Sequence, residues 1–348
     1  ATSQKDMKSL RCGFIFLAAV LCLAVSTCAQ EQKFADLGDF KLVSGEVLRD
    51  CRIGYRTFGK MNADRSNIVV LPTWAGGTTE QLKSNVGPGK LISDADYFVV
   101  LMDALSNGVS SSPSNSTAQP HMKFPKIAVR DMVNAEHEVL TKTLGIQHVK
   151  AVMGISMGGM QTFQWMVSYP DFMDKAIPIV GSPHVAPYDI VVWRINIDSI
   201  ENSVGWNNGD YTQNPAQLVH FEIGELILQT PAQYNQTHTR EQVLQALKKS
   251  ETDKANDANN TIRQSEAMMT LDVSDAFGGS MEKAAAAVKA KVLVVVARQD
   301  HTVTPQPARN FAELLHAPML ELESSCGHLS PDCESAKVAA AVADFLQK

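Results

Sequence analysis

The fold is decided by the sequence Val149-Lys150-Ala151-Val152-Met153-Gly154-Ile155-Ser156-Met157-Gly158-Gly159-Met160-Gln161. The apolar run at residues 149–153 predicts a buried strand, and the helical pattern of residues 157–169 stops before a proline. Between them, G-I-S-M-G predicts a sharp turn, because glycine lets backbone segments pass closely. A strand, a G-x-S-x-G turn and a helix together present a serine hydroxyl at the positive end of the helix. We therefore predict that Ser156 is a nucleophile.

The chain on either side of this stretch predicts strands that alternate with helices. A hairpin is expected at residues 38–58, and further strands at residues 68–71, 97–102, 175–180, 292–297 and 319–322. Helices are expected at residues 129–144, 307–315 and 334–346. This alternation is typical of a parallel sheet joined by right-handed crossovers. With the serine turn, it predicts an α/β-hydrolase fold, a mostly parallel sheet flanked by helices.

The pattern changes between residues 181 and 290, where polar helical stretches replace the alternation. We interpret this segment as an inserted helical lid over Ser156. The fold core then has two parts, residues 34–180 and residues 291–348. An Asn- and Asp-rich patch at residues 253–260 leaves a linker open as an alternative at that point.

Residues 1–29 resemble a secretory signal peptide. Lys8 and Arg11 precede an apolar run at residues 13–25, and Thr27-Cys28-Ala29 follows as a cleavage site. The run is short for a membrane span. We therefore predict a secreted or periplasmic protein that has no stable membrane span after cleavage. A retained anchor and a lipid-modified Cys28 are the alternatives.

Composition narrows the possible partners. The chain has 348 residues, 45% of them apolar, and a net charge of −6, which suits one large α/β domain with an insertion. The acidic balance argues against nucleic acid and polybasic membrane contact. The sequence has no H-E-x-x-H, paired C-x-x-C or P-loop motif, so we expect no metal and no cofactor. The expected partner is a small-molecule ester or acyl substrate, and a homodimer is left open.

A serine hydroxyl needs a base, and the base needs an acid that orients it. In an α/β-hydrolase the chain order is serine, acid, histidine. Asp300 follows the predicted strand at 292–297, and His328 follows the one at 319–322. Both residues therefore fall at the sheet edge where Ser156 emerges. We predict that Ser156, Asp300 and His328 form a catalytic triad.

The tetrahedral intermediate of acyl transfer needs backbone donors for its oxyanion. One predicted donor is the N–H of Met157, the residue after the nucleophile. The other should come from the loop after the strand at 68–71, where we choose Ala75 and keep Trp74 as the alternative.

Three cysteines remain after the predicted signal peptide: Cys51, Cys326 and Cys333. Cys326 and Cys333 lie on either side of the segment that holds His328, and an exported protein meets oxidising conditions. A disulfide that braces this segment and three unpaired thiols are equal alternatives. An odd count leaves at least one thiol free unless it pairs between chains.

Three segments, taken with the triad, resemble the homoserine O-acetyltransferase family of α/β-hydrolases. They are residues 50–59 (DCRIGYRTFG), residues 154–161 (GISMGGMQ) and residues 206–211 (WNNGDY). The resemblance covers most of the chain after residue 34. It implies that Ser156, Asp300 and His328 are the triad of an acyl-transferring enzyme.

Two departures from this family bear on the substrate. An aspartate that receives the amine of homoserine follows the catalytic histidine in the acetyltransferases, and here Leu329 stands there. The family's lid carries an arginine for the homoserine carboxylate, but residues 218–229 contain none. Arg194 lies earlier and is the alternative partner. Buried recognition of charge is hard to replace with apolar residues.

We therefore predict an exported serine hydrolase that cleaves a carboxylic ester through an acyl-enzyme. The alternative is an acyltransferase that passes the acyl group to an alcohol. Export argues against acetyl-CoA, a cytosolic donor. A non-catalytic ligand-binding relative is a third possibility, against which the complete triad argues.

Overall fold

The computed structural model describes residues 31–216, 218–252 and 256–348. The predicted signal peptide lies outside these residues and stays a prediction. In the part of the chain that is described, no helix is both long enough and apolar enough to cross a membrane.

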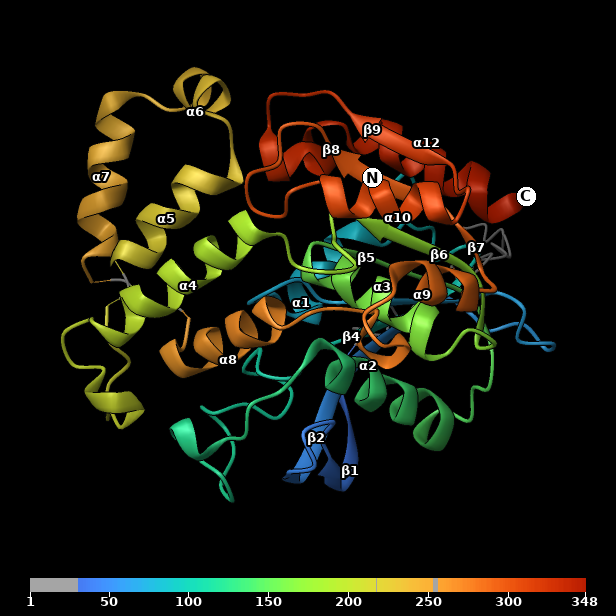
Figure 1. Ribbon diagram of the computed structural model, residues 1–348, viewed down its shortest axis with the longest axis horizontal. Coiled ribbons are helices and arrows are strands. Elements are labelled where there is room, and N and C mark those ends of the chain that lie inside the picture. The colour runs from blue at the N-terminus through green and yellow to red at the C-terminus, as the bar shows by residue number, and fades with distance from the viewer. Residues whose placement is uncertain (1–30, 217, 253–255) are drawn as a thin grey trace, which may run out of the picture. The chain divides into compact units, whose positions relative to one another are not determined.

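The core of residues 32–348 is one sheet, in which the described residues form nine strands. Eight follow the order β1-β2-β4-β3-β5-β6-β8-β9, and β7 pairs with β6 (Figure 1). Their bounds are β1 (Lys33–Lys41), β2 (Val47–Phe58), β3 (Ile68–Pro72), β4 (Phe98–Met102), β5 (Val149–Ile155), β6 (Met173–Ile179), β7 (Lys291–Val292), β8 (Val294–Ala297) and β9 (Met319–Leu322). β1 and β2 form the predicted hairpin, β2 also pairs antiparallel with β4, and the other pairs are parallel. The predicted mostly parallel sheet is confirmed.

Apolar side chains from the central strands are buried on both faces of the sheet. In β3, Ile68 and Val70 join one apolar cluster, whereas Val69 and Leu71 join another. This alternation follows from the two-residue period of a strand. The first cluster packs against α2 (Val129–Glu138), α3 (Met157–Ser168), α9 (Met281–Ala287) and α10 (Gln306–Leu314). The second packs against α1 (Thr79–Leu82) and α12 (Ser335–Gln347).

Between β6 and α9, the described residues form five α-helices: α4 (Pro187–Glu201), α5 (Leu218–Leu228), α6 (Pro231–Thr237), α7 (Arg240–Ser250) and α8 (Ala258–Met269). Helix α4 contacts α5 and α8, and α5 contacts α7, so these helices form one group beside the sheet (Figure 1). The group has an apolar cluster of its own, which includes Ile197, Trp206 and Ile262.

The Asn- and Asp-rich patch starts a helix rather than a linker over its described residues. The Asp257 side chain accepts a hydrogen bond from the N–H of Asn260 and so caps α8. Asn259 and Asn260 are buried. Toward the end of residues 181–290, α9 contributes Ala284 and Ala285 to the main core.

A carboxyl group lies fully buried in α2. Glu136 Oε2 accepts a hydrogen bond of 2.8 Å from Trp165 Nε1, and Glu136 Oε1 has no partner among the described residues. Burial raises the pKa of Glu136 from 4.5 to about 8, and the bond from Trp165 lowers it in part.

We expect Glu136→Gln to change the pH dependence of stability. Because the pKa is raised, the stabilisation tied to the neutral carboxyl is fully present below pH 4.5 and is lost as the pH rises through about 8. The unfolding free energy of the wild type, relative to the variant, should therefore fall by on the order of 4 kcal/mol across this window. Urea unfolding between about pH 5 and about pH 9 measures it.

The matched control is Glu138→Gln, because Glu138 forms a surface ion pair with Lys142 in the same segment. The difference in unfolding free energy between this variant and the wild type should change much less over the same pH range, because the ion pair is partly exposed. An equally small change for Glu136→Gln would contradict the assignment of a buried, neutral carboxyl.

Candidate active site

The predicted turn at Ser156 forms a strained junction between β5 and α3. Ser156 has φ 59° and ψ −122°, a backbone conformation that side chains rarely adopt. Glycine is required on both sides of Ser156. A Cβ on Gly154 would lie 2.4 Å from the backbone of Gly158, and one on Gly158 would lie 2.6 Å from the carbonyl oxygen of Pro72. The strain places the Ser156 hydroxyl at the N-terminus of α3, at the carboxyl end of β5.

Among the three predicted triad residues, His328 lies within hydrogen-bonding distance of both Ser156 and Asp300. His328 Nε2 is 2.8 Å from Ser156 Oγ, and His328 Nδ1 is 2.7 Å from Asp300 Oδ2. Because a carboxylate only accepts hydrogen bonds, Nδ1 carries the proton and Nε2 accepts from the serine. Asp300 and His328 are both buried, whereas the neighbouring His301 is exposed.

Two carboxylates hold the loop that carries Asp300 in place: that of Asp300 itself and that of Asp189. Asp300 Oδ1 accepts hydrogen bonds from the N–H groups of Thr302 (2.8 Å) and Val303 (2.9 Å). Asp189 of α4 accepts from the N–H and the hydroxyl of Thr304. Burial, with a smaller effect of the Asp300 charge, raises the pKa of Asp189 to about 6. Sequence reasoning missed Asp189, which lies 111 positions before Asp300 and fixes the acid loop from the inserted helices.

The loops that carry Asp300 and His328 are tied to the end of α5 and to the segment that follows it. The hydroxyl of Thr302 donates to the carbonyl of Ile227 at 2.9 Å. The hydroxyl of Thr230 donates to the carbonyl of Ser325 at 2.7 Å. The end of α5 and Thr230 therefore help to set the distance between Asp300 and His328.

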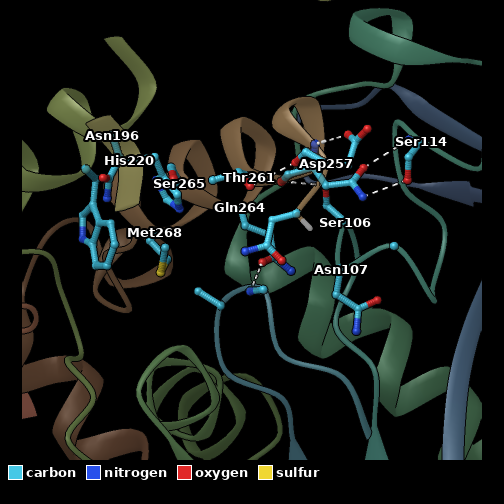
Figure 2. A pocket seen from close by; sticks show the side chains of 16 residues that line it. Ser106, Asn107, Ser114, Asn196, His220, Asp257, Thr261, Gln264, Ser265 and Met268 are labelled. Carbon is cyan, nitrogen blue, oxygen red and sulfur yellow. Dashed lines mark hydrogen bonds between the residues drawn. The ribbon is translucent and has the colours of Figure 1, made fainter. Parts of the chain in front are cut away.

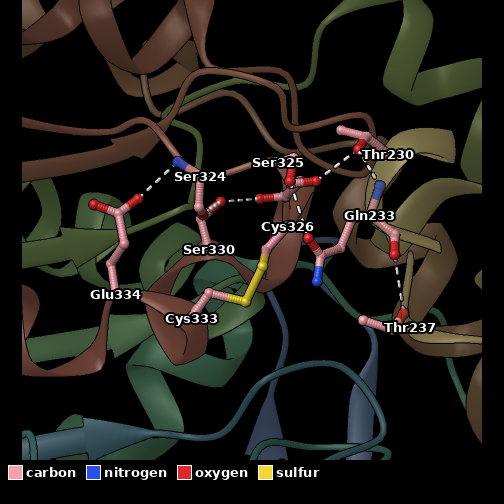
Figure 3. The surroundings of a disulfide bond; sticks show 10 residues. Thr230, Gln233, Thr237, Ser324, Ser325, Cys326, Ser330, Cys333 and Glu334 are labelled. Atoms are coloured by element: carbon pink, nitrogen blue, oxygen red, sulfur yellow. Dashed lines mark hydrogen bonds between the residues drawn. A yellow bond between two sulfur atoms is a disulfide. The ribbon is translucent and has the colours of Figure 1, made fainter. Parts of the chain in front are cut away.

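A disulfide closes the segment that carries His328. Cys326 and Cys333 are bonded, with a Cα–Cα distance of 6.5 Å (Figure 3). Around it, the hydroxyls of Ser324 and Ser330 hydrogen-bond at 2.9 Å (Figure 3). Of the two alternatives that the sequence leaves open, the structure has the disulfide. Cys51 is the free cysteine of the described residues, and burial raises its pKa to about 12.

The loop after β3 lies against the start of α3, as an oxyanion hole requires. Gln161 Nε2 donates to the carbonyls of Thr73 (3.0 Å) and Met157 (3.3 Å) and so connects the two elements. The N–H groups of Met157 and Ala75 have no acceptor among the described residues. Their role as oxyanion donors stays a prediction, and so does the alternative with Trp74.

A cavity of about 320 Å³ borders this loop (Figure 2). Its wall is joined to the loop by Gln264, whose Oε1 accepts from the N–H of Gly76 at 2.7 Å and whose Nε2 donates to the carbonyl of Leu105 at 3.0 Å. The other lining residues are mostly polar and come from the loops after β3 and β4, from α4, α5 and α8, and from the two residues before α8: Ala75, Ser106, Asn107, Gly108, Ser114, Trp193, Asn196, His220, Asn256, Asp257, Asn260, Thr261, Ser265 and Met268.

The structure places two further residues with respect to the cavity. His220 has no motif around it in the sequence, yet it lines this cavity. Arg194, the alternative partner for a substrate carboxylate, is exposed and forms ion pairs with Asp198 and Glu201. Arg194 is not among the residues that line the cavity, whereas its neighbours Trp193 and Asn196 on α4 are.

The family model of the alpha/beta hydrolase fold matches residues 67–332. The chain belongs to the α/β-hydrolase family. It is 27% identical over 309 residues to an ethyl acetate hydrolase of Pseudomonas veronii. This match covers 84% of this chain and 88% of that protein. It is 34% identical over 184 residues to a probable esterase of Corynebacterium glutamicum, a match that spans about half of each protein (52%).

The resemblance to homoserine O-acetyltransferases is also confirmed. The enzyme of that name from Methanococcoides burtonii is 27% identical, over 89% of this chain and 72% of its own length. Among solved structures, the acetyl esterase MekB superimposes with a TM-score of 0.86 at 25% identity, over 91% of this chain and 97% of that one. This chain therefore has both esterases and acetyltransferases among its relatives.

Proposed function

We propose that this α/β-hydrolase is a serine esterase that cleaves a small carboxylic ester through an acyl-enzyme on Ser156. The observation that carries the proposal is the chain of hydrogen bonds from Ser156 through His328 to Asp300. Similarity to an ethyl acetate hydrolase along most of both chains supports an ester as substrate.

In the first half-reaction, Ser156 Oγ attacks the ester carbonyl while His328 Nε2 accepts the hydroxyl proton. Asp300 stabilises the imidazolium, since both of its oxygens are fixed by hydrogen bonds. The N–H groups of Met157 and Ala75 stabilise the oxyanion. His328 then gives its proton to the alcohol oxygen, the ester bond breaks, and the acyl group stays on Ser156.

In the second half-reaction, water takes the place of the alcohol. His328 accepts a proton from the water as it attacks the acyl-enzyme, and then returns that proton to Ser156 Oγ. The products are the carboxylic acid and the free enzyme. We further propose that helices α4–α8 act as the lid of this site, because they bear on both the acid loop and the histidine loop.

Transfer of the acyl group to homoserine is the alternative. It requires that a charged acceptor be held beside the acyl-enzyme and that water be excluded. Leu329 offers no partner for an amine, and no lysine or arginine is among the described residues that line the cavity. Both observations favour water as the acceptor.

We expect the purified enzyme to hydrolyse short-chain esters and not to acetylate homoserine from acetyl-CoA. Release of acid from a panel of p-nitrophenyl and alkyl esters measures the first activity. Free thiol and O-acetylhomoserine, detected by mass spectrometry, measure the second. Thiol release that depends on homoserine, with an equal amount of ester formed, would replace the hydrolase proposal with the transferase.

We also infer that the protein is exported. The support is the charged and apolar pattern of residues 7–29 together with the Cys326–Cys333 disulfide, which fits an oxidising compartment. The N-terminus of the native protein is therefore expected near Gln30, outside the cytoplasm. Mass analysis of the N-terminal peptide decides this, and an intact Met7 in a cytosolic fraction would contradict it.

A further inference from the structure

The loop after β3, residues 73–79 (the Ala75 loop), pairs nearly all of its backbone N–H groups. Those of Trp74 and Ala75 have no acceptor among the described residues. The others donate as follows: Thr73 to the carbonyl of Met102 (3.0 Å), Gly76 to Oε1 of Gln264 (2.7 Å), Gly77 to the carbonyl of Trp74 (3.0 Å), Thr78 to Oε1 of Gln81 (2.9 Å) and Thr79 to Oδ1 of Asp103 (2.8 Å). The loop therefore keeps free the N–H groups predicted for the oxyanion and is held on both sides of them.

One of these acceptors belongs to a helix far away in the sequence. Gln264 lies in α8, 188 positions after Gly76, and is 2% exposed (Figure 2). Besides accepting from Gly76, it donates through Nε2 to the carbonyl of Leu105 at 3.0 Å. Only this orientation of the amide fits, because the reverse would set its NH₂ group against an N–H and its oxygen against a carbonyl. Both polar ends of one buried side chain thus connect α8 with the loops after β3 and β4.

The bond from Gly76 matters because of the turn to which Gly76 belongs. The N–H of Gly77 donates to the carbonyl of Trp74, and Gly76 has φ 68°, which is typical of the third position of a type II turn. The N–H of that third residue has no partner within the turn and needs an acceptor from elsewhere. Because peptide units are planar, the bond from Gly77 fixes the unit that carries the Ala75 N–H, and the bond to Gln264 fixes the next unit. Ala75 is therefore held from both sides.

The Ala75 loop also lies against the start of α3. Gln161 Nε2 donates to the carbonyls of Thr73 (3.0 Å) and Met157 (3.3 Å), so α3 holds the first residue of the loop. The position of the loop relative to Ser156 is thus set from α3 by Gln161 and from α8 by Gln264. Donors stabilise an oxyanion most when they are in place before the charge develops. A side chain that holds their loop therefore bears on the rate of the chemical step.

We propose that Gln264 is a positioning residue of the esterase, which holds the Ala75 loop in the orientation in which one of its backbone N–H groups receives the oxyanion. The inference rests on the proposed esterase function and gives α8 a part in stabilising the transition state. Gln264 acts through Gly76 and Ala75, so its removal lowers the rate without the loss of any reacting group.

Kinetics of Gln264→Met give the first test, since methionine keeps the length of the side chain and removes both polar atoms. We expect kcat for a short-chain ester to fall by at least about 10-fold, with KM nearly unchanged, because the oxyanion forms only in the transition state. A smaller fall in kcat, or a loss expressed only in KM, overturns the inference.

A transition-state analogue separates positioning from a general structural role. Ethyl trifluoromethyl ketone adds to Ser156: a bond forms between Oγ and the carbonyl carbon, the hydroxyl proton passes to His328, and the carbonyl oxygen becomes an oxyanion. We expect its Ki to rise in Gln264→Met by about the factor by which kcat/KM falls. A protein that is merely partly unfolded has fewer active sites but the same Ki. An unchanged Ki beside a lowered rate therefore overturns the inference.

Asn259→Leu is the matched control. Asn259 is another buried amide of α8, but it bonds to Trp206 Nε1 (2.9 Å) and to the carbonyl of Gly209 (2.8 Å), outside the Ala75 loop. Its replacement should lower the melting temperature and leave kcat and Ki close to those of the wild type. Equal changes of kcat and Ki in Asn259→Leu and Gln264→Met would make the effect one of helix stability and overturn the inference.

Amide exchange tests the hold on the loop without catalysis. Ala75-Gly76 is the only Ala-Gly pair in the sequence, so carbonyl-¹³C alanine combined with ¹⁵N glycine gives a single NMR signal, that of the Gly76 N–H. We expect this N–H to exchange slowly with solvent in the wild type and at least about 10-fold faster in Gln264→Met. An unprotected Gly76 in the wild type overturns the inference, and this measurement needs no variant.

The two kinds of failure are distinct. If the wild type cleaves no ester, the proposed function fails, and amide exchange alone decides whether Gln264 holds the Ala75 loop. If esters are cleaved but Gln264→Met changes neither the exchange of Gly76 nor the Ki of the ketone, the esterase stands and the inference fails.

Discussion

Ser156→Ala is expected to lower kcat/KM for short-chain esters by about 10⁴-fold or more. The hydroxyl of Ser156 is the group that His328 Nε2 faces at 2.8 Å, and no acyl-enzyme forms without it. Removal of the nucleophile from a serine triad costs about as much as removal of the whole triad, so only binding and the oxyanion donors remain. Initial rates with a p-nitrophenyl ester and with an alkyl ester measure the loss.

Ser168→Ala is the control for this change. Ser168 ends α3, the helix that Ser156 begins, and its hydroxyl accepts a hydrogen bond from Gln164 at 2.8 Å. Its replacement should leave the rate close to that of the wild type. If Ser156→Ala keeps more than about a tenth of the wild-type kcat/KM, another group is the nucleophile.

Asp300→Ala and His328→Ala are each expected to lower kcat by about 10³-fold or more, and the double variant should lose little further. The two side chains act as one unit, because Asp300 fixes the tautomer and orientation of the imidazole through a bond of 2.7 Å. Once the histidine is gone, the acid has nothing to orient. Single-turnover rates of the wild type, the two single variants and the double variant complete this double-mutant cycle.

His301→Ala is the control here, since His301 adjoins Asp300 in the sequence but is exposed. It should retain nearly the full rate. Losses that multiply fully between Asp300→Ala and His328→Ala would indicate that one of the two has been misassigned.

Local patterns were enough to predict the elements that carry the triad. β5, the turn at Ser156 and α3 form a continuous stretch, so their strand, glycine and helix patterns are read without knowledge of the rest of the chain. Asp300 and His328 could be added because parallel strands end at one edge of a sheet, which turns positions far apart in the sequence into neighbours.

The cavity could not be predicted in the same way. Its wall combines α4, α5 and α8, and helix packing of this kind is not fixed by any local pattern. One signal was present in α8, where Asn260, Thr261, Gln264 and Ser265 repeat at helical spacing and give that helix a polar stripe. A polar stripe normally indicates a fully solvent-exposed face, whereas here these residues are mostly buried and line the cavity.

The disulfide could not be predicted from a local pattern either. The spacing of Cys326 and Cys333 is compatible with free thiols and with a bridge, and the choice depends on where the turns at Gly327–Leu329 and Ser330–Cys333 place the two side chains.

The charge of Arg194 was visible in the sequence, but its partners Asp198 and Glu201 became clear only from the helical face that they share.

Covalent labelling with an organophosphonate tests the central claim, that Ser156 carries the acyl group, most directly. The reagent phosphonylates the activated serine and stays bound, so intact mass gives the stoichiometry and peptide mapping gives the position. The account predicts one adduct per chain, on the peptide that contains Gly154-Ile155-Ser156, with loss of ester hydrolysis in proportion to labelling. Labelling at another residue, or labelling that persists in the Ser156→Ala protein, would contradict it.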